Sequence, residues 1–149
     1  TSAPLHGPGC NVEIVRGAID FVVPAVEVID SRYLDFKFDL KSVIADNTSA
    51  AGFVIGGRML PIDALDVRTE GVVLVKNGTV AEVGAGAAVL GNPLASVAML
   101  ANMLADKGEH IPSGSFIMTG GITAAVPVAS GDNVMAHYQS LGTVRMRFV

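Results

Sequence analysis

The sequence predicts one domain of the α/β class that is rich in strands and contains two substantial helices. Three observations support this prediction. The chain has 149 residues, of which 50% are hydrophobic and only 16% are charged, which is typical of a single well-packed domain. Residues 71–84 form two apolar alternating runs around Asn77 and Gly78, a hairpin pattern. Residues 92–107 carry the end signals and the apolar content of a buried helix.

Both helices are predicted from their caps and their apolar spacing. Asn92 is a candidate N-cap with Pro93 at the first helical position, and Gly108 ends the pattern. The apolar side chains of the helix over 92–107 cover more than one face, so we expect this helix to be largely buried and packed on the sheet. A second amphipathic helix is expected over 12–22, with Asn11 as its N-cap. The apolar residues behind these predictions are Leu94, Val97, Met99, Leu100, Met103 and Leu104, and Val12, Val15, Ile19 and Val22.

The remaining elements are shorter. Pro24 opens an extended run from Ala25 to Ile29, and a buried strand ending in two glycines is expected over 50–57. A short helix is expected over 39–47 and one helical turn over 61–66. After the long helix, three more strands are predicted at 115–121, 133–138 and 143–149, the last two joined by a turn.

Composition and motifs exclude several classes of protein. The net charge of −4 and the lack of a Lys/Arg cluster argue against a nucleic-acid partner. We find no apolar run that we expect to span a membrane and no signal peptide, and the single Cys10 cannot form an internal disulfide, so we expect a cytoplasmic protein. The glycines of 84–93 lack the spacing of nucleotide-binding motifs and predict a turn before a helix. Because the chain begins at Thr1 in a Pro/Gly-rich loop, we interpret it as a piece of something longer or a processed product.

Glu27 raises the main question about a site, because it lies between Val26 and Val28 in the extended run. In a strand its side chain points away from both valines, and burying a carboxylate without a partner is costly. One interpretation is an ion pair with Arg32 or Arg58, which the residue pattern alone favours. The other is a ligand for Mg²⁺ or Mn²⁺, although one carboxylate is not a complete site.

Two further polar clusters could contribute to a site. Asp46, Asn47, Thr48 and Ser49 precede the strand at 50–57. In the segment 118–128, two glycines are flanked by threonines, and such a loop lets backbone N–H groups approach an anion closely. Each cluster alone is ordinary loop chemistry, but together with Glu27 they would offer a carboxylate, hydroxyl donors and an anion-binding loop.

Several segments resemble the hydratase and decarboxylase branch of the fumarylacetoacetate hydrolase family, and the resemblance covers essentially the whole chain. They are "APLHGPGC", "VEVIDSRY", "DFKFDL", "VIADNTSAAGFVIGGRM", "GAGAAVLGNPLASVAMLANMLA" and "GEHIPSGSFIMTGGITAAVPVASGDN". The resemblance implies a mixed, strongly curved β-sheet core with a few packed helices. It also implies that residues 1–149 are the C-terminal portion of the catalytic core domain, without its N-terminal region.

The resemblance also implies a site. Glu27 matches a family metal ligand that holds Mg²⁺ (or Mn²⁺) together with two glutamates of the N-terminal region, and this replaces the ion-pair interpretation. The family's catalytic lysine also lies in that region, so the catalytic residue of this chain stays unknown. Ser49 matches a position at the substrate. The loop expected to hold the substrate's carboxylate matches Thr119, Gly120, Gly121 and Thr123.

The implied reaction is the metal-dependent decarboxylation of 2-oxo-3-hexenedioate, a small 2-oxo dicarboxylate, to 2-oxopent-4-enoate and CO₂ in the meta-cleavage catabolism of aromatic compounds. No organic cofactor is expected, because the conjugated ketone is its own electron sink. A 2-oxopent-4-enoate hydratase of the same family is the alternative, and a non-catalytic fragment or assembly subunit is an alternative of another class. Homo-oligomers and a complex with the partner hydratase are also implied.

Overall fold

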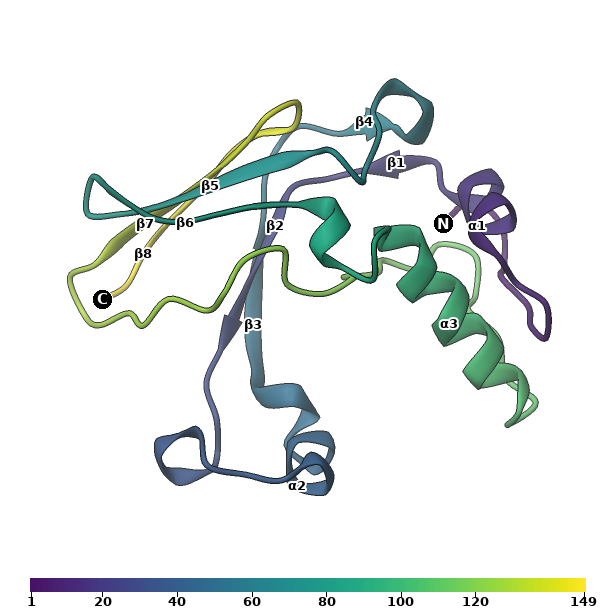
Figure 1. Cartoon of the computed structure of the whole chain (residues 1–149), viewed down its shortest axis with the longest axis horizontal. Coiled ribbons are helices and arrows are strands. Elements are labelled where there is room, and N and C mark those ends of the chain that lie inside the picture. Colours follow the sequence, from purple (N-terminus) through teal and green to yellow (C-terminus); the bar gives the residue numbers. More distant parts are fainter.

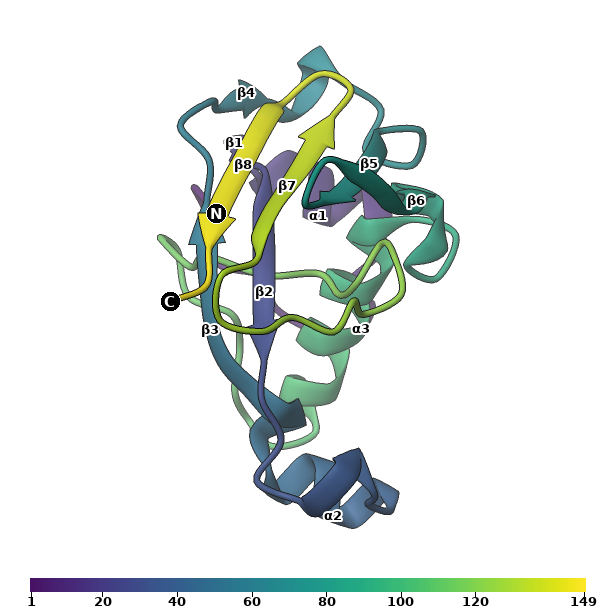
Figure 2. The same cartoon turned by 90° about the vertical axis from the view of Figure 1, so that its left-hand side faces the viewer.

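The computed structural model describes residues 1–149 and arranges them as three antiparallel sheets and three helices (Figure 1). The helices α1 (Val12–Ala18) and α3 (Pro93–Ala105) pack together at one end of the molecule. A four-stranded sheet lies at the other end. A two-stranded ribbon, made of residues 25–29 and 50–55, lies between these two ends and leads to α2 (Leu40–Ala45), which projects from the body (Figures 1 and 2).

The four-stranded sheet has the order β6-β5-β7-β8, and all of its neighbours are antiparallel. Its first two strands form the predicted hairpin, and Asn77 and Gly78 have the positive φ values, 51° and 84°, that a tight turn requires. The predicted strands at 133–138 and 143–149 are confirmed as the second hairpin. The strands are β5 (Gly71–Lys76), β6 (Thr79–Ala85), β7 (Asn133–Tyr138) and β8 (Gly142–Arg147).

Two smaller pairs of antiparallel strands connect the helices to this sheet. The ribbon consists of β2 (Ala25–Ile29) and β3 (Ala50–Ile55), and the other pair is β1 (Phe21–Val22) with β4 (Leu60–Pro61). The expected short helix at 39–47 is confirmed as α2, and the expected turn at 61–66 is a 3-10 turn, Ile62–Ala64. The strand at 50–57 is present, but its predicted burial is wrong, since Phe53 and Ile55 are 57% and 52% exposed. Of the rest of the chain, the ring of Phe116 stacks on Phe53, and both side chains stay half exposed.

Both predicted helix caps are confirmed. The Asn11 side chain accepts hydrogen bonds from the backbone N–H groups of Glu13 and Ile14, each at 3.0 Å. The Asn92 side chain accepts from the Leu94 N–H at 3.0 Å. However, α1 ends at Ala18, four residues before the predicted end, because residues 21–22 extend to pair with β4.

The long helix α3 buries one face rather than most of its surface. Leu94, Val97 and Ala101 join the main core, where Val15 of α1 and Leu5 are fully enclosed. The prediction of a largely buried helix is wrong for the opposite face, because nothing in this chain covers it. There the side chains of Met99, Leu100 and Met103 are 51%, 40% and 58% exposed.

The segment Gly86–Ala105 corrects the expectation that no apolar run could span a membrane. Its 20 residues and mean hydropathy of 1.5 satisfy the length and composition of a spanning helix. Leu90 and Gly91 interrupt it with positive φ values, so the regular helix begins only at Pro93. Thirteen helical residues rise about 20 Å, against about 30 Å of hydrocarbon in a bilayer. Core helices also pass this composition test, and α3 packs one face into the core.

The predicted strand at 115–121 is absent. Residues 116–126 have no regular secondary structure, and none of their backbone groups forms a hydrogen bond with another part of the chain. A strand needs a neighbour to complete its ladder, and this chain places no neighbour there.

Candidate functional site

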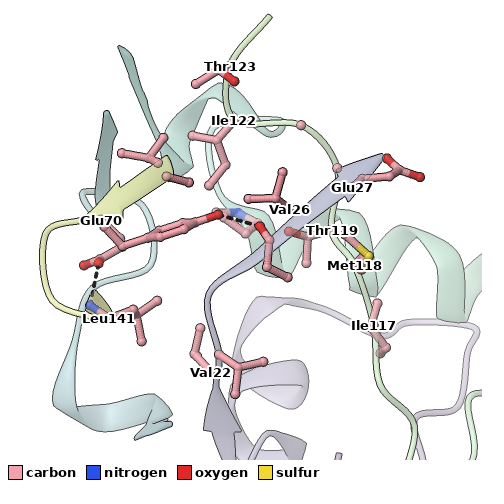
Figure 3. A pocket seen from close by; sticks show the side chains of 18 of the residues that line it. Val22, Val26, Glu27, Glu70, Ile117, Met118, Thr119, Ile122, Thr123 and Leu141 are labelled. Atoms are coloured by element: carbon pink, nitrogen blue, oxygen red, sulfur yellow. Dashed lines mark hydrogen bonds between the residues drawn. The ribbon is translucent and has the colours of Figure 1, made fainter. Parts of the chain in front are cut away.

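A cavity of about 850 Å³ lies between the four-stranded sheet, the ribbon, the first turns of α3 and the segment 114–126. Forty residues line it, and 28 of them are hydrophobic. Val72 of β5 and Val97 of α3 form parts of its walls. Val26 of β2 forms another part (Figure 3). An apolar cavity of this size with a few polar groups is the usual form of a small-molecule site.

Glu27 lies on β2 opposite Phe53 and has an exposed side chain at the edge of this cavity. Figure 3 shows its carboxylate pointing away from the apolar cluster that contains Val26, as the strand alternation predicts. The ion-pair interpretation is wrong, because Arg32 pairs with Asp46 instead and Arg58 forms no salt bridge. The carboxylate of Glu27 is therefore left without a cationic partner.

The segment 119–123 lines the same cavity as Glu27. Gly120 has a φ of 120°, in the region that favours glycine, and the flanking Thr119 and Thr123 are half-buried. The structure thus brings together the metal-ligand candidate and the loop predicted to hold a carboxylate, Thr119, Gly120, Gly121 and Thr123. Their roles stay predictions.

A close packing contact positions this segment. A Cβ atom at Gly84 of β6 would lie only 2.4 Å from the carbonyl oxygen of Ile122. No side chain fits between these two backbones, so the glycine allows the segment to pack directly on the sheet. Sequence reasoning assigned Gly84 to a turn and did not predict the contact, because it joins residues 38 positions apart.

Ser49 does not line the cavity, whereas its neighbour Thr48 does. The Ser49 side chain is buried, and its hydroxyl donates a hydrogen bond to Asp46 Oδ2 at 2.9 Å. Asn47, Thr48 and Ser49 all have positive φ values, between 51° and 61°, which marks a strained turn. The role of Ser49 at the substrate stays a prediction.

Asp46 is the centre of the polar cluster predicted before the strand at 50–57, and the structure adds Arg32 and Ser31, which the sequence did not predict, as its partners. Its buried carboxylate accepts from Arg32 Nε at 2.5 Å, Ser49 Oγ at 2.9 Å and Ser31 Oγ at 3.3 Å. Burial raises the pKa of Asp46, but the hydrogen bonds from Ser49 and Arg32, the Arg32 charge and the Ser31 hydroxyl outweigh it and hold the pKa below its usual range. This cluster joins the end of β2 to the turn before β3.

At the other side of the cavity from Glu27 lies a second buried carboxylate, Glu70 (Figure 3). Its Oε1 atom accepts from the backbone N–H groups of Ser140 and Leu141, at 2.7 and 3.2 Å, and so fixes the β7–β8 turn. The neighbouring Tyr138 hydroxyl donates to the Ala25 carbonyl at 2.5 Å, which ties β7 to the start of β2. Burial raises the pKa of Tyr138, and the negative charge of Glu70 adds to the effect.

The side chains of this chain do not complete a metal site. No group of three or more His, Cys, Asp or Glu residues is arranged to hold a metal ion. The Glu27 carboxylate is a hard oxygen ligand of the kind that Mg²⁺ and Mn²⁺ prefer, and it has no competing partner. The chain therefore offers one carboxylate ligand, Glu27, to a divalent metal ion.

No family model matches the chain. Among solved structures, the fold matches decarboxylases with a bound divalent metal. The structure of 4-oxalocrotonate decarboxylase from Pseudomonas putida G7 complexed with magnesium and adipate has a TM-score of 0.97 and 66% identity, and covers 100% of this chain and 57% of that chain. A structure of the enzyme with calcium and acetate gives 0.94 and 64%. The predicted α/β fold is confirmed.

Curated relatives agree with this comparison. The 4-oxalocrotonate decarboxylase of Pseudomonas sp. strain CF600 is 66% identical over all 149 residues, which cover 56% of that protein. The 2-oxo-hept-4-ene-1,7-dioate hydratase of Escherichia coli is 36% identical and matches 98% of this chain and 57% of its own length. The chain thus spans little more than half the length of these relatives. Over its whole length it is homologous to part of a 4-oxalocrotonate decarboxylase, which confirms the expected resemblance.

Proposed function

We propose that this chain is the C-terminal portion, residues 1–149, of the catalytic core domain of a 4-oxalocrotonate decarboxylase. The reaction is the conversion of 2-oxo-3-hexenedioate to 2-oxopent-4-enoate and CO₂ in the meta-cleavage catabolism of aromatic compounds. The observation that carries the proposal is the 66% identity to such enzymes over the full chain, against 36% to a hydratase. The cavity shared by Glu27 and the segment 119–123 supports it.

Glu27 contributes one carboxylate to a Mg²⁺ (or Mn²⁺) site, and the rest of the longer protein contributes the other ligands and the catalytic lysine. Its exposed position at the edge of the cavity, without an arginine partner, supports this role. When bound, the metal supplies a Lewis acid that polarises the substrate's 2-oxo group.

The other residues bind and orient the substrate. The backbone N–H groups of Thr119, Gly120, Gly121 and Thr123 have no partner within the chain and are available to a carboxylate. The apolar walls exclude water from the conjugated carbons. In the reaction the bond to the departing CO₂ breaks, its electron pair moves through the double bond toward the 2-oxo oxygen, and a proton is added. Ser49 is assigned to the substrate by the family resemblance alone, because its buried hydroxyl donates to Asp46 and does not line the cavity.

The test uses a chimera in which this chain replaces the matching 57% of the P. putida G7 enzyme. The purified chimera is given 2-oxo-3-hexenedioate with Mg²⁺, and CO₂ release is followed. CO₂ formation supports the decarboxylase. Hydration of 2-oxopent-4-enoate without CO₂ release would instead support the hydratase, which the 36% match to the E. coli relative keeps as the second candidate. A folded chimera with neither activity would favour a non-catalytic assembly role.

Assembly and location complete the proposal. A homo-oligomer is supported by the projecting arm around α2, where Leu34, Leu40 and Ile44 are 85%, 74% and 66% exposed (Figure 2). A complex with 2-oxopent-4-enoate hydratase and a cytoplasmic location follow from the proposed catabolic role. Light scattering of the chimera, alone and with that hydratase, measures both associations.

A further inference from the structure

Glu27 shares its face of the β2–β3 ribbon with an aromatic ring. The strand register places Phe53 of β3 directly opposite Glu27. Directly opposed side chains of an antiparallel pair lie on one face, with Cβ atoms about 4.5–5.5 Å apart. The neighbouring Val26 and Val54 point to the other face and pack against the four-stranded sheet. Figure 3 shows the Glu27 carboxylate pointing away from Val26, and therefore to the face that carries Phe53.

A second aromatic ring extends this surface. The ring of Phe116 stacks on that of Phe53, with centroids 6.0 Å apart and planes 19° apart. Nearly parallel rings in contact at about 3.5 Å are offset by roughly 5 Å at this centroid distance, so the two rings overlap little. The two rings, called here the aromatic pair, therefore present one broad surface of nearly parallel faces instead of covering each other.

The aromatic pair connects the two parts of the proposed site. Phe53 lies opposite Glu27, and Phe116 lies three residues before Thr119, where the loop predicted to hold a carboxylate begins. Phe116, Glu27 and this loop line one cavity. Because the substrate has to reach Glu27, the rest of the longer protein must leave space beside this carboxylate, and the ring opposite Glu27 borders that space.

The proposed substrate has a flat middle. In 2-oxo-3-hexenedioate the ketone is conjugated with the double bond, so these atoms lie near one plane, whereas a saturated diacid of the same length is flexible. Flat conjugated groups pack on the faces of aromatic rings in offset stacks, and an aliphatic side chain offers no such face. The bond to the departing CO₂ must stand perpendicular to this plane when it breaks, because its electron pair then joins the conjugated system and moves toward the 2-oxo oxygen.

We propose that the aromatic pair, Phe53 and Phe116, is a specificity-determining surface on which the conjugated part of the substrate packs. One face of the substrate lies on the rings, and CO₂ leaves from the other face. This inference rests on the proposed function, because it takes Glu27 as the end of the site that holds the 2-oxo group. Phenylalanine has no titratable or hydrogen-bonding group in its side chain, so the pair acts through packing alone.

The test compares two ligands of equal length and charge in the chimera with Mg²⁺ present. Hexa-2,4-dienedioate is flat and conjugated, whereas adipate is saturated. Calorimetry gives both dissociation constants in the parent and in the single variants Phe53→Leu and Phe116→Leu. We expect the preference for the conjugated ligand, expressed as the ratio of the two constants, to fall about threefold or more in each variant. Magnesium affinity should stay the same, because Glu27 is intact.

The matched control is Phe36→Leu, at a ring that is 51% exposed and lies outside the aromatic pair, and it should leave the ratio unchanged. Equal ratios in the parent and in both variants of the pair would overturn the proposal. A parent chimera that binds magnesium but neither diacid would also overturn it. If a leucine variant does not fold, the parent decides: nuclear Overhauser effects between the olefinic protons of the conjugated ligand and the rings of Phe53 and Phe116 support the contact, and their absence contradicts it.

Neither ligand is a substrate, so binding is tested separately from the reaction. A chimera that shows the change in ratio but releases no CO₂ contradicts only the proposed function. A chimera that releases CO₂ and shows no change in ratio contradicts only this inference.

Discussion

Replacing Gly84 by alanine should displace the segment that we assign to substrate binding. The new Cβ would lie 2.4 Å from the Ile122 carbonyl oxygen and 3.2 Å from Thr123 Cγ2. Carbon–oxygen contacts between backbones normally begin near about 3.3 Å, so β6 and the segment must separate by about 1 Å. The change is due to this contact, because Gly84 does not have a positive φ that alanine would avoid.

The magnitude follows from the size of this displacement. Overpacking of this kind costs about 1–3 kcal/mol of unfolding free energy. A misplacement of about 1 Å in a substrate-positioning group can reduce turnover about 100-fold. Both effects are measured in the chimera, by denaturant unfolding and by the rate of CO₂ release.

The matched control is Gly71→Ala in β5, the neighbouring strand of the same sheet. Its Cβ would meet only Gln139 Oε1 at 3.5 Å and a backbone oxygen at 4.0 Å, which are ordinary contacts. If Gly84→Ala kept the stability and turnover of Gly71→Ala, the contact with Ile122 would not position the segment, and this part of the account would be wrong.

Three further predictions concern the stability of the chimera. Hydrogen bonds from Lys76, Asn77 and the Ala129 N–H hold the pKa of Asp132 at about 2, below the unfolded value of about 3.9. Asp132 therefore stabilises the fold above pH 4, and this contribution is lost as the pH falls toward 2. Asp132→Asn should flatten that part of the curve of unfolding free energy against pH, and an unchanged curve would refute the assignment. Leu5→Ala, at a side chain 1% exposed, should cost about 2–5 kcal/mol in urea unfolding, whereas Leu90→Ala, 62% exposed, should change stability by less than about 0.5 kcal/mol. Asn92→Ala should cost about 1 kcal/mol by removing the cap of α3, and Asn92→Ser should restore most of it.

Local signals in the sequence predicted the elements whose stability is local. The Asn77-Gly78 hairpin and the caps at Asn11 and Asn92 depend on residues within a few positions, and each is present. The strand predicted at 115–121 failed for the opposite reason. A strand exists only with a neighbour, and sequence periodicity does not say whether the neighbour is in the same chain.

In the site, too, local sequence signals did not predict partners that lie far apart along the chain. The residue pattern suggested Arg32 as a partner for Glu27, but the ribbon places Arg32 against Asp46, 14 residues farther along. Glu70 was not predicted, because its partners in the β7–β8 turn lie 70 residues away. The association of Glu27 with the segment 119–123 came from a family resemblance, and no spacing in the sequence indicates that they share a cavity.

The central claim is that Glu27 is a magnesium ligand in a site completed by the rest of the protein. Calorimetric titration of Mg²⁺ into the chimera and into its Glu27→Gln variant tests this claim most directly, with Glu109→Gln as the control at an exposed carboxylate. An amide keeps the shape and removes one charge, so the account predicts one site per chain in the parent and the control, weakened about tenfold or more by Glu27→Gln. Equal magnesium affinity in all three proteins would contradict it.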